Sequence, residues 1–119
     1  MTMVTESKAQ QRHLPQSAAR TAFLIETVGS GAAVARLLGV SRSQPYRWST
    51  GDETPGPESA RLLLDLDHVL ARAMLVWPRD VALDWLEGSN SHLDGARPID
   101  VVKERGSAEV IRALDGAFA

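Results

Sequence analysis

The side chains with the most distinctive chemistry lie in the run RSQPYR, residues 42–47. An arginine can donate two hydrogen bonds to a guanine edge or hold a phosphate, and a glutamine can pair with adenine. The hydroxyl groups of serine and tyrosine can donate to phosphate oxygens. The run therefore predicts contact with DNA through the following side chains: Arg42, Ser43, Gln44, Tyr46 and Arg47.

Side chains suited to catalysis or metal binding are not grouped in the same way. His13, His68 and His92 lie far apart in the sequence, and none belongs to a pair with metal-ligand spacing. Asp65 and Asp67 are two residues apart, so on a helix they would not face each other. No candidate nucleophile stands near a candidate base. We therefore expect the chain to have no enzymatic activity, no metal site and no cofactor.

The residues around the basic run predict the two helices that would present it. Residues 30–48 resemble a helix-turn-helix, in which Gly39 can take the left-handed conformation that ends the first helix. Ser41 can cap the second helix, and Ala35 is small where the two helices would cross. Apolar side chains at helical spacing should hold the pair in the core. They are Val34, Leu38, Val40 and Trp48.

The spacing of apolar residues predicts an all-α chain. The longest helix should begin at Pro57 and form the centre of the fold, because a wide apolar face lies opposite its polar stripe. That apolar face consists of Leu62, Leu66, Val69, Leu70, Ala73 and Trp77. The helices expected outside the helix-turn-helix are 17–28 with Ser17 as its N-cap, 57–76, 78–86, 98–105 and 108–115.

Residues 85–106 predict a rigid corner between short helices. Pro98 suits the first turn of a helix, where its missing N–H would have no partner, and Asp100 places negative charge near the positive helix end. Gly88 and Gly95 are free to take positive φ values, as a tight reversal often requires.

This corner resembles the toxin-binding domain of the Xre/MbcA/ParS antitoxins. The family's run is Trp-Leu, Pro-Asn, Leu-Gly-Gly, Arg-Pro-Leu-Asp-Leu and a closing Gly. The matching residues are Trp85-Leu86, Ser89-Asn90, Leu93-Asp94-Gly95, Arg97-Pro98-Ile99-Asp100-Val101 and Gly106. Ser89 replaces a favoured proline, and Asp94 replaces a frequent glycine. The resemblance covers residues 57–119.

The resemblance implies an antitoxin of a type II toxin–antitoxin pair. Its partners would be a RES-domain toxin that consumes NAD and is encoded in the same operon, and the operator DNA through which the antitoxin represses that operon. The antitoxin's C-terminal domain would cover the toxin's active-site cleft. The matching toxin-binding positions are Asn90, Leu93, Gly95, Arg97, Ile111, Arg112, Asp115, Phe118 and Ala119. The apolar tail, residues 116–119, would pack locally or be kept for the partner.

Charge is divided unevenly along the 119 residues. Residues 1–48 hold six basic and two acidic side chains, a balance of +4, and the remainder holds seven and 13, a balance of −6. This division suggests a polyanionic partner for the first half, although charge also fluctuates along ordinary chains. We expect a flexible arm at 1–16, a DNA-binding region at 17–56 and a toxin-binding domain at 57–119.

The cellular setting and the alternative function follow from simpler features. The chain has no cysteine and no apolar stretch of membrane-spanning length, so we expect a cytoplasmic protein that does not enter a membrane. Helix-turn-helix proteins commonly bind DNA as symmetric dimers, so a homodimer or a larger toxin–antitoxin assembly is expected. The alternative is a stand-alone transcriptional regulator whose C-terminal helices serve dimerisation or ligand sensing.

Overall fold

The computed structural model describes residues 16–118, and every regular element in that range is helical. The all-α prediction is confirmed. Of the predicted flexible arm, all but Gln16 lies outside the described residues. The elements are α2 (Gln16–Val28), α3 (Gly31–Leu38), α4 (Gln44–Thr50), α5 (Pro57–Ala73), α6 (Arg79–Glu87), the 3-10 turn η1 (Ser91–Leu93), α7 (Pro98–Arg105) and α8 (Ala108–Phe118).

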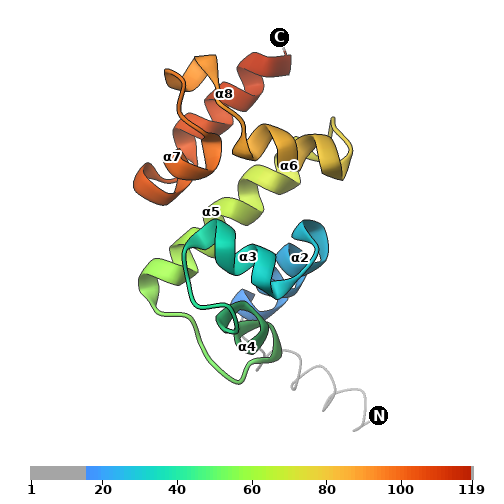
Figure 1. Cartoon of the computed structure of the whole chain (residues 1–119), viewed down its shortest axis with the longest axis vertical. Coiled ribbons are helices and arrows are strands. Elements are labelled where there is room, and N and C mark those ends of the chain that lie inside the picture. Colours follow the sequence, from blue (N-terminus) through green and yellow to red (C-terminus); the bar gives the residue numbers. More distant parts are fainter. Residues whose placement is uncertain (1–15, 119) are drawn as a thin grey trace, which may run out of the picture.

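Helix α5 is the central helix, as predicted. It packs against α2 on one side and against α6, α7 and α8 on the other (Figure 1). The predicted apolar residues from Leu62 to Ala73 are all buried, and so is Leu63, which the predicted face did not include. Leu63 is covered because α5 has neighbours on more than one flank. The helix ends at Ala73, before the predicted Val76. The chain then continues in a tighter turn, in which the backbone N–H of Val76 donates to the carbonyl oxygen of Ala73.

Arg61 ties α5 to α7. Its guanidinium donates to the carbonyl oxygens of Val102 at 3.3 Å and Lys103 at 3.0 Å. Both carbonyls lie in the last turns of α7, and that of Val102 also accepts from the backbone N–H of Gly106 at 3.0 Å. Arg61 also pairs with Asp65 at 2.9 Å on α5 itself. The arginine therefore fixes the end of the α7 helix on the central helix.

The N-terminal helices form a small bundle in which α4 packs against both α2 and α3. Helix α2 begins at Gln16, so Ser17 lies inside its first turn and is not the predicted N-cap. The Ser17 carbonyl oxygen instead accepts a hydrogen bond from the Thr21 hydroxyl at 2.6 Å. Among the described helices, none is alone long and apolar enough to cross a membrane. Taken together, α2 and α3 are long and apolar enough for a membrane span, but the pair is bent by 100°.

The turn between α3 and α4 differs from the prediction at its second half. Gly39 has φ 73° and ends α3 in the left-handed conformation, as predicted. Ser41 does not cap α4 with its side chain. The backbone N–H of Ser41 instead donates to the side-chain oxygen of Gln44 at 3.1 Å, and the regular helix begins at Gln44. This contact corresponds to one of the two hydrogen bonds of a capping box, in which a side chain accepts from the backbone N–H of the residue three positions earlier.

The corner contains the predicted start of α7. Pro98 is its first residue, Arg97 is its N-cap and Gly106 follows its end. Gly95 has φ 88°, as expected, whereas Gly88 has φ −90° and ψ 153°, an extended conformation that needs no glycine. The positive φ predicted for Gly88 is wrong, because the chain leaves α6 in an extended conformation and reverses later, around η1.

Asp94 takes φ 57° and ψ 34°, the left-handed conformation that favours glycine. We predict that Asp94→Gly raises the free energy of unfolding by up to about 1 kcal/mol, because glycine carries no steric penalty there. Gly95→Ala, at the neighbouring positive φ, should lower it by about 1 kcal/mol or more. Urea denaturation measures both. A less stable Asp94→Gly would show that the aspartate side chain itself stabilises the turn.

Candidate functional site

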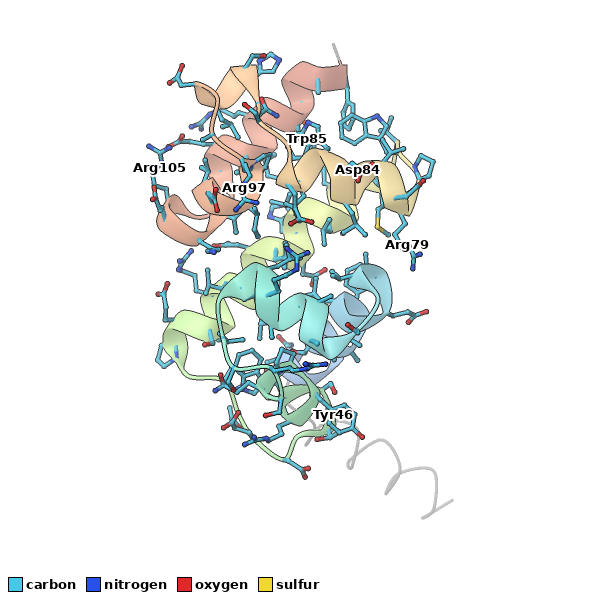
Figure 2. The ribbon with its side chains drawn as sticks, viewed as in Figure 1. Tyr46, Arg79, Asp84, Trp85, Arg97 and Arg105 are labelled. Atoms are coloured by element: carbon cyan, nitrogen blue, oxygen red, sulfur yellow. The ribbon has the colours of Figure 1, made fainter. Side chains whose placement is uncertain are left out.

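The five residues predicted to contact DNA lie together at one end of the molecule, on α4 and the turn before it. Pro45 and Trp48 are buried and anchor the inner side of α4. Tyr46 is 66% exposed and projects outward at this end (Figure 2). Arg42, Ser43 and Arg47 are also exposed, and Gln44 is half-buried. Pro45 lacks the backbone N–H that a helix interior uses, but it is tolerated because it lies in the first turn of α4.

Three of these side chains take part in hydrogen bonds within the chain. The Arg47 guanidinium donates to the Ser43 hydroxyl oxygen at 2.6 Å, which orients the arginine along the outer face of α4. The side-chain oxygen of Gln44 accepts from the Ser41 backbone N–H at 3.1 Å. Pairing with adenine requires a glutamine to accept and to donate at once. The bond to Ser41 occupies one of the two lone pairs of the Gln44 oxygen, so Gln44 shapes the turn and keeps a second lone pair and its amide N–H groups for a base.

Among residues 16–48, the positive charge that is not paired with a carboxylate gathers at the same place. Arg20 pairs with Asp67 on α5 at 3.3 Å, and Arg36 pairs with Glu87 on α6 at 3.0 Å. Within residues 16–48, Arg42 and Arg47 form no such ion pair with a carboxylate. The charge imbalance seen in the sequence is therefore reduced by ion pairs along α2 and α3, and it persists at α4.

The C-terminal half carries the residues predicted to contact a toxin, and two of them are structural. The side-chain oxygen of Asn90 accepts from the backbone N–H of His92 at 2.9 Å, and its carbonyl oxygen accepts from that of Gly95 at 2.8 Å. Leu93 is buried in the core. Asn90 and Leu93 thus build the corner, and Gly95 is exposed at its turn.

Arg97 and Asp100 form an exposed pair at the start of α7. Two hydrogen bonds join them, at 2.9 and 3.0 Å. The hydrogen bond from Arg97 is the largest influence on Asp100, and it lowers the pKa of that carboxyl below its ordinary value. Figure 2 shows Arg97 at the edge of the corner.

We predict that Arg97→Ala moves the pKa of Asp100 back toward the ordinary aspartate value, as measured by NMR titration of the carboxyl carbon. A depressed pKa in the folded state means that this pair stabilises the fold above the unfolded-state pKa. That contribution is lost as the pH falls through the folded-state pKa. Because both side chains are well exposed, the effect on stability should be small. An unchanged titration would contradict the paired geometry.

Helix α8 holds the remaining toxin-binding candidates. Ile111 is half-buried, Arg112 is exposed, and Asp115 pairs with Arg72 on α5 at 3.0 Å. Phe118 packs edge-on against Trp77, with ring centroids 5.0 Å apart. The helix was expected to end near Asp115 but continues to Phe118, so the described part of the apolar tail is helical and packed locally. Ala119 lies outside the described residues.

A hollow of about 350 Å³ lies between η1 and α8, lined by His92, Leu93, Glu109, Arg112 and Ala113. Leu93 and Arg112 were among the candidates. One face of α8 carries Glu109, Arg112 and Ala113, which are three and four residues apart. Helical spacing from Arg112 could therefore have predicted Glu109 and Ala113 as well. Nothing in the sequence signals His92.

Gly116 lets α8 pass the ring of His92. A Cβ atom at Gly116 would lie 3.1 Å from His92 Cε1, closer than carbon atoms normally approach. Within residues 16–118, no three histidine or carboxylate side chains are grouped closely enough to hold a metal ion. The surface formed by η1 and α8 is therefore charged and partly hollowed.

The chain is similar to known antitoxin proteins in sequence and in structure. Residues 71–118 match the model of the antitoxin Xre/MbcA/ParS C-terminal toxin-binding domain. The fold is similar to a chain in the crystal structure of the M. tuberculosis MbcT–MbcA toxin–antitoxin complex, with a TM-score of 0.72 and 25% sequence identity. That similarity covers 86% of this chain and 93% of the other. No curated protein matches the chain.

Proposed function

Because this chain is an antitoxin of the Xre/MbcA/ParS type, we propose that it neutralises a RES-type, NAD-consuming toxin encoded in the same operon. It would act by binding, with its C-terminal helices covering the entrance to the toxin's active-site cleft. The observation that carries this proposal is the match of residues 71–118 to a toxin-binding domain. The stand-alone regulator considered from the sequence does not account for that domain.

The exposed face of α8 offers the side chains that such a complex needs. Arg112 is exposed beside the hollow and forms no ion pair with the described residues, whereas the neighbouring Asp115 and Glu109 are each paired with an arginine. An unpaired guanidinium can dock on a carboxylate of a partner without first breaking a bond in its own chain. We propose Arg112 as the main polar toxin contact, with Arg97 as a second.

Charge reversal at two places tests this proposal. Arg112→Glu should weaken binding to the co-encoded toxin by at least about tenfold, since like charges would replace a charge pair across the interface. Calorimetry with the purified toxin, and growth of cells that express both proteins, measure the effect. Arg42→Glu is the matched control, with the same change of charge at the other end, and it should bind the toxin normally. Equal toxin binding by Arg112→Glu and the unaltered chain would overturn the proposal.

We further propose that α4 binds operator DNA and that the protein thereby represses its own operon in the cytoplasm. The cluster of Arg42, Tyr46 and Arg47 supports this function, since it is exposed and lies far from α8 along the molecule (Figure 1). The α3–α4 pair would be the helix-turn-helix, residues 17–56 the DNA-binding region and residues 57–119 the toxin-binding domain. A homodimer, or a larger assembly with the toxin, would place two α4 helices on a symmetric operator.

A further inference from the structure

Large apolar side chains are exposed where α5 turns into α6. Leu75 is 82% exposed, Val76 60% and Val81 42%, and Phe118 at the end of α8 is 36% exposed. We call these four residues the elbow surface. Single exposed apolar residues are ordinary on a protein surface, whereas a contiguous group commonly marks an interaction site.

Trp77 links the parts of the elbow surface. Leu75 and Val76 directly precede Trp77, and the rings of Trp77 and Phe118 are in edge-on contact, with centroids 5.0 Å apart. Trp77 also contacts Trp85, with centroids 5.8 Å apart, and Val81 lies one turn before Trp85 on the same side of α6. Phe118 and Val81 therefore adjoin one aromatic cluster, and Leu75 and Val76 lie in the turn that leads into it.

A rigid layer supports this surface from below. Ala73, Ala82 and Leu114 are completely buried and form a second small core, against which Trp77 and Trp85 pack. The layer joins the end of α5, α6 and α8, so the backbone that carries the exposed side chains is anchored. A surface that is already ordered loses little conformational entropy when a partner covers it.

The position of the surface indicates which partner covers it. The elbow surface lies entirely within residues 71–118, the segment that matches a toxin-binding domain, whereas the exposed Leu64 of α5 lies before that segment. Phe118 belongs to α8, the helix that also carries the proposed toxin contact Arg112; Phe118 faces Trp77, whereas Arg112 faces η1. Charged side chains border it, with Arg79 and Asp84 at the edge of α6 (Figure 2). An apolar centre with a polar rim is typical of protein–protein interfaces.

We propose that the elbow surface is a second toxin contact, which docks against an apolar hollow on the toxin while α8 approaches the cleft. This inference rests on the proposed function and adds Leu75, Val76 and Val81 to the corner and α8 candidates, which already included Phe118. The apolar contact would supply affinity through burial, and the charged α8 face would supply orientation.

The test uses the full chain and the purified co-encoded toxin. Leu75→Glu and the milder Leu75→Ser should both weaken toxin binding, by at least tenfold for the glutamate, and leave binding to operator DNA unchanged. Leu64→Glu is the matched control, because it places the same charge on an exposed leucine outside the matched segment; it should bind toxin normally. Circular dichroism confirms folding, which both Leu75 variants should retain because the side chain is exposed.

Different outcomes separate this inference from the proposed function. Normal toxin binding by both folded Leu75 variants, with the unaltered chain also binding, overturns the inference alone. No toxin binding by the unaltered chain overturns the proposed function and the inference together. If light scattering shows that Leu75→Glu instead breaks a homodimer while toxin affinity is kept, the surface binds a second copy of this chain and the inference is wrong.

Discussion

Replacing both Arg42 and Arg47 with alanine should weaken binding to the operon's own promoter fragment on the order of a hundredfold. Each arginine that contacts a base edge is worth about 1–3 kcal/mol, and any phosphate contact that is lost adds to this. Arg42 lies in the turn before α4 and Arg47 in the middle of the helix; both are exposed, and neither is paired with a carboxylate in the described residues. Fluorescence anisotropy at constant salt measures the change. If both contacts are to phosphates, the dependence of log K on log salt should fall by about two.

A single substitution elsewhere provides the control for that result. Arg36→Ala also removes one exposed positive charge, but Arg36 lies on α3 and is paired with Glu87. Its effect on DNA affinity should be small, and the double variant should still bind the toxin. If Arg36→Ala weakens DNA binding as much as the double variant does, α4 is not the DNA-binding helix.

The DNA-binding candidates show what a sequence pattern can and cannot specify. Residue types and helical spacing placed the five side chains on one end of the molecule, because the buried Pro45 and Trp48 fix which face of α4 is outward. The pattern could not reveal bonds among the candidates themselves. Gln44 accepts from the Ser41 backbone and Ser43 accepts from Arg47, so their availability depends on local geometry.

The same contrast holds in the C-terminal half. Helix α7 was predicted with both of its ends because Pro98 and Gly106 are local signals. The ends of α5 and α8 were misplaced because they depend on distant partners. Contact between Trp77 and Phe118 brings the end of α8 against the turn that follows α5, and no local residue announces it. Asn90 and Leu93 matched a family motif, yet in this chain Asn90 holds the corner through its hydrogen bonds and Leu93 through its burial.

Trp48→Ala should lower the free energy of unfolding by about 3–5 kcal/mol, the usual cost of removing a large buried side chain. Trp48 is only 2% exposed and belongs to the main core, which also contains Leu24 of α2 and Leu63 of α5. Domains of this size are stable by about 5–15 kcal/mol, so this one substitution would remove a large part of the total. Urea denaturation followed by circular dichroism measures the loss.

A second core substitution shows whether the two ends unfold together. Leu114→Ala, in the small core under the elbow surface, should cost about 2–5 kcal/mol. The main core runs without interruption from α2 through α5 to Val110 of α8. Both variants should therefore lower the midpoint of one shared transition, and a destabilised DNA-binding end should also reduce toxin binding near that midpoint. Two separate transitions, each sensitive to one substitution, would show that α5 joins two independently folding halves.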